Sequence, residues 1–489
     1  MVDEPVTLTA WDYVVPPVMA VITDYGTDGQ VYAELQKRTG VTLNFTTANL
    51  LTASDSMSLM VAANELPDMI FNFGMFYTGN MDDLVDGDVI VNFEDYRDVM
   101  PNYFDILDNN PPLHETSIQS PGLWCCREYS GQPDPLLRSA IRQDWLDADG
   151  LDTPVTVDDL YNVLKTFQEK NDCAHPFWIA ANGNSTLGSA FGITANGDNN
   201  ALGGWVYQDD QIQYCVPMDG FRDYIQLMAD WYQEGFISPD FMSQTMNNTA
   251  TDDEIVGNAS GFFTTSVNGI NNLSGYEPDS NVQPVRAMVL NEGDLCGFDD
   301  AGTSRISKGG AAVAGTCPDI ELALRIIDYF YSDDGILLAN YGVEGVSFEY
   351  NAEGEPIFTD LITNNPDGYD FALCLIKYTS STPCSICINE RNYLGYTDAQ
   401  VNAIDLWLRN TTSTQAPGAV WTVEDQTEYS GISSDVGSFV STTCLQFITS
   451  GKSMDEWDSF IEEVNSSFDI ARMTELYQNA IDTYLSIGA

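Results

Sequence analysis

The sequence predicts an α/β fold with at least two domains. At 489 residues the chain is longer than a single hydrophobic core usually grows, and its hydrophobic residues, 44% of the total, suffice for two packed cores. Strand-like and helix-like segments alternate from the N-terminus, and a run of small apolar residues far along the chain, 309–315, predicts one more buried strand.

The first seventy residues predict a parallel sheet. The expected strands are 6–10, 41–46 and 69–73, and the expected helices between them are 30–39 and 54–64. A βαβαβ order implies parallel strands joined by right-handed crossovers. Ligands of such sheets bind beyond the carboxyl ends of the strands, which here carry Trp11-Asp12 and Asn72-Phe73.

The run Gly309 to Gly315 leaves no room for bulky side chains, which suits a buried strand or a crossover where two backbones approach closely. A helix is predicted to open at Cys317-Pro318-Asp319, with an apolar stripe that includes Leu322 and Ile326. We expect Ser332 to Gly335 to form a turn with a glycine stop, and a second short helix to end at Gly342.

Other helices follow from capping signals and apolar stripes. Thr156 with Asp159 three residues later predicts a capping box, and 221–234 and 398–408 read as further helices. Residues 432–449 form a segment with apolar residues such as Val436 and Phe439. Gly261 to Thr264 reads as a short strand. Arg142 and Asp144 are expected to form a structural ion pair rather than to contact a ligand.

The charge of the chain limits its partners. Eighteen Lys and Arg against 73 Asp and Glu give a net charge of −55. Nucleic acids and anionic membranes need clustered cations, so neither is expected as a partner. The same negative charge disfavours polyanionic substrates, unless a local Arg cluster outweighs it, and favours neutral ligands.

The ten cysteines leave two interpretations open. An even count in an exported protein suggests disulfides, whereas the irregular spacing and the adjacent Cys125-Cys126 fit buried thiols equally well. Cys384 and Cys387 form a lone CxxC without a second CxxC or a His pair. We therefore expect a short-range disulfide or two core thiols there rather than a zinc site.

Sequence motifs give no support for an enzyme. His114 and His175 are the only histidines, and the chain contains no HExxH, GxSxG or GxxxxGK[ST]. A pair of carboxylates at glycosidase spacing cannot be picked out among 73 acids. No catalytic residue, metal or cofactor is therefore expected.

Several long stretches resemble the family 1 extracellular solute-binding proteins that serve ABC importers, and the long, lipoprotein-type members most closely. They include the stretch Asn340 to Gly368, the element Asn92 to Tyr103, the segment Ile141 to Asp147, the helix and stop Phe221 to Pro239, and the C-terminal stretch from Trp457 to Tyr484. Some long members carry an acidic calcium loop, but Lys170 to Ala174 lacks the alternating oxygen ligands here.

The resemblance implies a periplasmic-binding-protein-like fold. Two lobes, each a central β-sheet flanked by helices, would be joined by a hinge with a ligand cleft between them. We expect residues 1–140 plus 309–365 to form lobe 1 and residues 141–308 plus 366–489 to form lobe 2. The protein would be a monomeric, extracellular bacterial lipoprotein shown in mature form, with its lipid-anchor cysteine upstream, and it would deliver its ligand to ABC permease subunits.

The aromatic content indicates carbohydrate, most simply a neutral oligosaccharide. Sugar rings offer C–H faces to aromatic side chains, while their hydroxyls bond Asp, Asn and similar groups. The ligand-binding residues expected on loops that face the cleft are Trp11, Asp12, Asn72, Phe73, Trp178, Trp205, Phe263 and Tyr429. About half of these aromatic residues are expected to be ordinary core. Trp145, Trp231 and Trp457 are better interpreted as core, and Trp407 and Trp421 are undecided.

Three alternatives stay open at this stage. A receptor of the same fold could take a peptide or another small solute, a secreted glycoside-active enzyme would release reducing sugar, and a surface adhesin would bind immobilised polymer but not short oligosaccharides.

Overall fold

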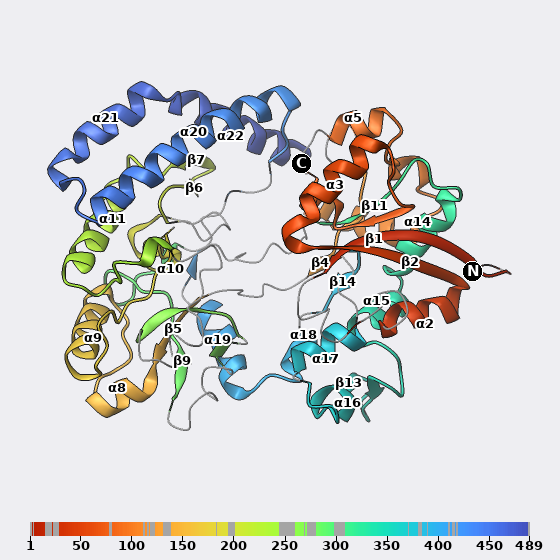
Figure 1. The fold of residues 1–489 in the computed structure, drawn as a ribbon, viewed down its shortest axis with the longest axis horizontal. Coiled ribbons are helices and arrows are strands. Elements are labelled where there is room, and N and C mark those ends of the chain that lie inside the picture. The colour runs from red at the N-terminus through yellow and green to blue at the C-terminus, as the bar shows by residue number, and fades with distance from the viewer. Residues whose placement is uncertain are drawn as a thin grey trace. The chain divides into compact units, whose positions relative to one another are not determined.

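The computed structural model divides into two compact units. Unit 1 comprises Met1–Gln132, Arg305–Gly395 and Ile487–Ala489, and unit 2 comprises Pro133–Ser304 and Tyr396–Ser486 (Figure 1). The structure describes the chain except residues 1, 3, 15–21, 23–28, 78–80, 111–112, 115–116, 118–122, 131–137, 182, 194–200, 244–259, 268, 271–279, 298–308, 370, 380–383, 389, 409–410, 413–415, 417–418 and 488–489. Within the described part, no helix combines the length and apolar character needed to cross a membrane.

Unit 1 is built on a four-stranded sheet in the order β11-β3-β1-β2. Its strands are β1 (Val6–Val14), β2 (Val41–Asn49), β3 (Met69–Phe71) and β11 (Ala311–Val313). β1 pairs in parallel with both β2 and β3, and β11 pairs with β3 in the antiparallel direction. The predicted parallel sheet and the buried strand within 309–315 are thus confirmed.

Helices that connect the strands bury their apolar faces against this sheet. They include α2 (Gln30–Thr39), α3 (Ala53–Ala63), α6 (Pro101–Asp108) and α14 (Ile320–Tyr329). Val31 and Leu35 of α2 and Ile326 and Ile327 of α14 belong to one core cluster with strand residues such as Leu43. The shorter elements of this part are η1 (Leu50–Thr52), α4 (Phe73–Phe76), α5 (Met81–Asp86), η2 (Phe93–Tyr96) and β4 (Tyr129–Ser130).

Small residues allow β11 to enter the sheet. A Cβ on Gly309 would lie 2.2 Å from Asn72 Oδ1, and one on Gly315 would lie 1.9 Å from the carbonyl oxygen of Asp88. Gly310 adopts a φ of +72° beside Cys126, a conformation that only glycine reaches without strain. The glycines at both ends of the run are therefore required by close backbone approach.

The segment after α14 differs from the prediction at Gly335. Gly335 does not stop a helix; it lies in the first turn of α15 (Asp333–Tyr341), where the Ser332 hydroxyl accepts a hydrogen bond from its N–H at 3.2 Å. A Cβ there would lie 1.8 Å from the carbonyl oxygen of Tyr329, so the glycine serves close packing. The predicted N-cap at Asp319 and the helix end at Gly342, with φ of +82°, are confirmed.

The rest of unit 1 forms a satellite around a second core cluster. Its elements are β12 (Phe348–Tyr350), β13 (Pro356–Phe358), α16 (Asp360–Thr363), α17 (Phe371–Tyr378), β14 (Ile386–Cys387) and α18 (Glu390–Tyr393). Cys374 of α17 is buried against Phe348 and Phe358. Residues 366–395 therefore group with unit 1, whereas the sequence analysis assigns them to the second lobe. The arrangement of the units as hinged lobes remains a prediction.

Unit 2 contains a three-stranded antiparallel sheet in the order β8-β5-β9. Its strands are β5 (Arg138–Arg142), β8 (Phe262–Thr265) and β9 (Val282–Pro284). Phe177 bridges to Phe262 in parallel and so extends the sheet by one segment beyond β8. Arg142 ends β5 and binds Asp144 at 2.6 Å, which confirms the expected ion pair.

The first helices of unit 2 pack around a large core cluster. They are α8 (Gln143–Asp149), α9 (Val157–Lys170), α10 (Ser185–Gly188) and α11 (Asp219–Gln233), with η3 (Ser189–Phe191), η4 (Phe241–Ser243) and the hairpin β6 (Trp205–Gln208) and β7 (Gln211–Tyr214). The predicted capping box of Thr156 and Asp159 is present at the start of α9. Trp145, Trp231 and Trp457 are buried in this core, as expected.

The chain ends in a helical layer of unit 2. Its elements are α20 (Val423–Ile448), η5 (Met454–Glu456), α21 (Trp457–Ser467) and α22 (Ile470–Ile487) (Figure 1). α19 (Asp398–Leu408) lies beside β9 instead, and the short strands β10 (Cys296–Gly297) and β15 (Thr411–Thr412) pair with each other. α20 begins at Val423, because Thr422 caps it by accepting a hydrogen bond from the N–H of Asp425. The helix therefore passes through Gly431.

The cysteines described in full are thiols. Cys125, Cys126, Cys173, Cys215, Cys317, Cys374, Cys384 and Cys444 are buried, and Cys387 is partly exposed. Of the two interpretations left open by the sequence, the structure therefore has thiols and not disulfides at these positions, including a buried Cys384 and a partly exposed Cys387 in the CxxC.

Glycine substitutions at two sites should have opposite effects on stability. Gly315→Ala should lower the free energy of unfolding by roughly 1–3 kcal/mol, because its Cβ collides with the Asp88 carbonyl. Gly437→Ala, in the exposed middle of α20 with no atom near its Cβ, should raise it by about 0.5–1 kcal/mol. Denaturant titrations of both variants test this, and an unchanged midpoint for Gly315→Ala would contradict the packing argument.

Candidate functional site

The carboxyl ends of β1 and β3 bring two predicted site residues of unit 1 together. Asn72 Nδ2 donates a hydrogen bond to Asp12 Oδ1 at 2.9 Å, and the Tyr13 N–H donates to the same oxygen at 2.8 Å. Asp12 is 1% exposed and Asn72 9% exposed. Asn72 has a φ of 58°, which turns the chain sharply after β3 and places its amide beside Asp12.

Burial gives Asp12 an unusual titration. Removal from water raises its pKa from 3.8 to about 7, and the two hydrogen bonds from Asn72 and Tyr13 offset only part of that rise. The carboxyl group can therefore change its protonation near neutral pH. Such groups gather at functional sites, although structural carboxyls show the same behaviour.

The predicted aromatic residues of unit 1 are enclosed. Trp11 is 1% exposed and Phe73 is fully buried, so their ring faces pack in the core. Sequence analysis did not select Trp124, whose ring lies 5.8 Å from that of Phe73. Its buried Nε1 has no hydrogen-bond partner among the residues described. No motif marks Trp124, because the contact depends on the fold.

In unit 2 the structure brings Trp205 and Tyr429 into one group. Trp205 Nε1 donates a hydrogen bond to Tyr429 Oη at 3.0 Å, although 224 residues separate them. Trp205 begins β6, and Tyr429 lies in the second turn of α20. Trp205 is 5% exposed, whereas Tyr429 is only partly buried.

Three further rings complete what we call the aromatic cluster, which consists of Trp205, Tyr214, Trp421, Tyr429 and Tyr477. Trp421 lies 4.7 Å from Tyr429 and 5.6 Å from Tyr477, with its ring nearly parallel to the latter. Tyr214 and Tyr477 each lie 5.3 Å from Trp205. All members except Trp205 are partly exposed.

Sequence reasoning left Trp421 undecided and did not select Tyr477 as a binding residue. The sequence offered one signal for Trp421, because the residue directly precedes Thr422, the N-cap of α20. That position fixes the Trp421 ring at the start of the helix. The meeting of α20 with α22 and the β6-β7 hairpin could not be predicted from local patterns.

Trp178 and Phe263 lie beside each other in the extended sheet of unit 2. The Trp178 N–H donates to the carbonyl of Phe262 at 2.9 Å. Phe263 is fully buried, whereas Trp178 is partly exposed. Next to them, Asn184 Nδ2 donates to Thr264 Oγ1 at 3.3 Å.

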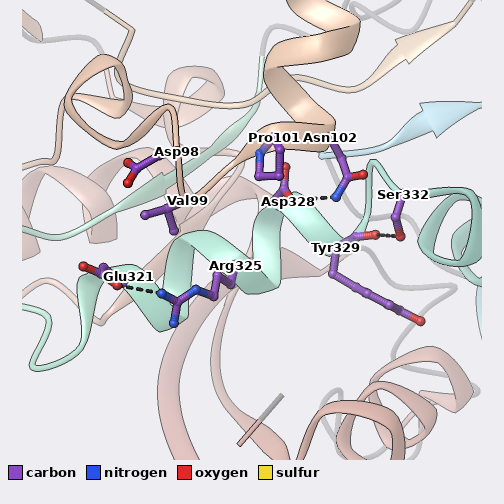
Figure 2. A pocket seen from close by; sticks show the side chains of 9 residues that line it. All are labelled: Asp98, Val99, Pro101, Asn102, Glu321, Arg325, Asp328, Tyr329 and Ser332. Carbon is purple, nitrogen blue, oxygen red and sulfur yellow. Dashed lines mark hydrogen bonds and ion pairs between the residues drawn. The ribbon is translucent and has the colours of Figure 1, made fainter.

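A cavity of about 380 Å³ lies on unit 1, away from all predicted site residues. It is lined by Asp98, Val99, Pro101, Asn102, Glu321, Arg325, Asp328, Tyr329 and Ser332, from the start of α6 and from α14 (Figure 2). Asp328 accepts hydrogen bonds from the Tyr103 N–H and from Asn102 Nδ2, and so caps α6. Glu321 pairs with Arg325 at 2.7 Å. These polar groups serve the packing of two helices.

The described residues show no grouping suited to catalysis by metal. No set of three or more His, Cys, Asp or Glu among them could hold an ion. His175 Nδ1 lies 2.8 Å from the carbonyl oxygen of Gly235, which ties a loop to the end of α11.

Two curated relatives resemble this chain. The fructooligosaccharide ABC transporter substrate-binding protein FusA of Streptococcus pneumoniae is 23% identical over 93% of this chain and 87% of its own length. Lipoprotein LipO of Bacillus subtilis is 24% identical over 46% of each chain. No protein-family model matches the chain.

The fold is also that of a solved relative. The structure of the S. pneumoniae protein FusA in complex with kestose superposes with a TM-score of 0.75 at 21% identity and covers 98% of this chain and all of that one. The chain is therefore similar over most of its length to a substrate-binding protein of an ABC transporter, and its fold is that of such a protein. Both similarities agree with the resemblance to the family 1 extracellular solute-binding proteins seen in the sequence.

The raised pKa of Asp12 predicts a pH-dependent stability. Between pH 4 and pH 7 the folded protein holds a proton on Asp12 that the unfolded chain releases, so stability falls as pH rises. Asp12→Asn should keep the hydrogen bonds from Asn72 and Tyr13, and its stability should not fall with pH at this site because an amide does not titrate. Its free energy of unfolding should exceed that of the parent by about 3 kcal/mol at pH 8.5 and match it near pH 4.

Denaturant titrations across that range measure the difference. Burial also raises the pKa of Glu128 to about 7. Its contribution to the pH dependence of stability is the same in the parent and in Asp12→Asn, so it cancels in the difference between them. Asp95→Asn, on the exposed start of η2, is the matched control. A constant difference between Asp12→Asn and the parent at all pH values would show that Asp12 does not titrate as described.

Proposed function

We propose that this protein captures an oligosaccharide outside the cell and delivers it to the permease subunits of an ABC importer. The full-length similarity to a fructooligosaccharide substrate-binding protein supports both parts of the proposal. Peptides and other small solutes receive no comparable support.

The aromatic cluster of unit 2 is the observation that carries the carbohydrate assignment. Five Trp and Tyr rings from three separate segments converge, and four of them remain partly exposed. Rigid aromatic faces suit the C–H patches of sugar rings, and the Tyr hydroxyls can bond sugar hydroxyls.

The net charge limits the ligand further. The net charge of −55 repels polyanions and favours an oligosaccharide of low charge. The neutral ligand expected from the sequence therefore stays a prediction, as does its capture by hinge closure.

The partners and the location follow from the same class. We infer that the protein works as a monomer, held at the bacterial surface by a lipid on a cysteine upstream of this sequence. The name of the relative Lipoprotein LipO supports the anchor. Sedimentation or light scattering of the purified chain would test the monomer.

We also propose that the protein lacks glycoside-hydrolysing activity. The curated relatives named above are a transporter substrate-binding protein and a lipoprotein, and neither is an enzyme by name. Incubation with the oligosaccharides that bind should release no reducing sugar, and release would support the enzyme alternative.

Loss of one ring should weaken glycan binding. Calorimetric titration with a broad panel of neutral oligosaccharides should yield at least one ligand. Trp421→Ala should weaken its affinity about tenfold, because the substitution removes a partly exposed ring from the surface that we propose for the sugar. Tyr350→Ala, 46% exposed on β12 of unit 1, is the matched control and should leave the affinity unchanged.

Two results would count against this assignment. If no member of the panel binds and no acidic oligosaccharide binds either, the carbohydrate function fails. If glycans bind and Trp421→Ala has no effect, the function stands but the cluster is not the binding surface.

A further inference from the structure

Several segments of the unit 2 sheet end at one edge. β8 and β9 both pair with β5 in the antiparallel direction, so they run parallel to each other (Figure 1 labels β5 and β9). Phe177 bridges to Phe262 in parallel and leads into Trp178. The carboxyl ends of these three segments therefore lie at the edge where β5 begins, which is where ligands of α/β sheets bind.

The register places four side chains along this edge. Arg138 pairs with Thr265, and the Val285 N–H donates to the carbonyl of Ser139 at 3.0 Å. Continuing that register by one residue sets Arg286 opposite Arg138. With strands about 4.8 Å apart, Trp178 and Arg286 lie roughly 15 Å from each other. We call Trp178, Thr265, Arg138 and Arg286 the donor edge.

Trp178 and Arg286 of the donor edge have buried N–H groups without an acceptor among the described residues. Trp178 Nε1 and Arg286 Nε are both shielded from water and bond no residue that the structure describes. The Arg286 guanidinium also forms no ion pair with the described residues, although the chain has 73 acidic side chains for 18 cationic ones. The side chain is partly exposed, so a ligand can reach it.

The donor edge lacks hydrogen-bond acceptors for Trp178 Nε1 and Arg286 Nε among the described residues. A buried donor without a partner costs free energy, and a guanidinium fits a carboxylate through two parallel hydrogen bonds. Arg138, buried with partners of its own, stands opposite Arg286, and like charges in that position destabilise a sheet. An anionic group beside Arg286 would relieve both costs, whereas a neutral hydroxyl suffices for the indole of Trp178.

We propose that the donor edge binds an acidic oligosaccharide, with one ligand carboxylate on Arg286 and a hydroxyl or ring oxygen on Trp178 Nε1. This inference rests on the proposed function and replaces the neutral ligand predicted from the sequence with a uronate-bearing oligosaccharide. The net charge of −55 still excludes polyanions. A single carboxylate can nevertheless bind, because its attraction to the nearby guanidinium acts over a short distance. The separation of roughly 15 Å suits two to three sugar residues.

Paired glycans test the proposal on the full-length protein. Each oligosaccharide with one uronate residue is titrated beside its carboxyl-reduced, neutral counterpart. At least one acidic member should bind about tenfold or more tightly than its counterpart. Arg286→Gln should reduce that ratio to about twofold while leaving the neutral affinity nearly unchanged, and Arg286→Lys should keep part of the ratio.

Two further variants separate this role from general damage. Trp178→Phe keeps the ring but removes the N–H, so it should weaken both members of a pair by the same factor, roughly two- to tenfold. Arg325→Gln, on the exposed face of α14 in unit 1, should change neither affinity. Circular dichroism melting confirms that each variant is folded.

The possible failures are distinct. If neutral glycans bind as tightly as their acidic partners, or if Arg286→Gln weakens both equally, the carboxylate site is wrong and the proposed function stands. If no glycan of either kind binds, the proposed function fails and this inference fails with it.

Discussion

Close contact between the backbone of Gly309–Gly315 and its neighbours is the constraint on which unit 1 depends. The run brings a strand from late in the chain against β3, where side chains at Gly309 or Gly315 would collide with Asn72 and Asp88. Because β11 completes the sheet from one side, the N-terminal residues and the segment after 305 must fold as one body. Asn72, which forms part of that contact, also holds the carboxyl group of Asp12.

The two units satisfy the polar groups at their strand ends differently. In unit 1, Asp12 has internal donors, and its burial turns it into a group that titrates near neutral pH. In unit 2, the indole of Trp178 and the guanidinium of Arg286 keep N–H groups for which the described residues offer no acceptor. A binding protein gains affinity when its hydrogen-bond donors are already in position before the ligand binds, because few side chains must then be reordered on binding.

Local patterns predicted the elements well where capping and periodicity agree, as for α2, α19 and the capping box of α9. They failed at Gly335. Gly335 looks like a stop signal, yet it lies inside α15 because the Tyr329 carbonyl leaves no room for a Cβ. Such requirements arise from atoms that become neighbours only in the folded chain. The same reason explains why Trp421, Tyr477 and Arg286 were not selected.

The sequence by itself determined the class of fold, the parallel order of the first strands, the low charge expected of a ligand and the resemblance to solute-binding proteins. These depend on composition, periodicity and motif spacing, which a linear chain contains. The tertiary structure decided which aromatic rings are enclosed, as Trp11 and Phe73 are, and which gather with exposed edges, as Trp421 and Tyr429 do. Exposure and unmet hydrogen bonds are properties of packing, so they exist only once distant segments meet.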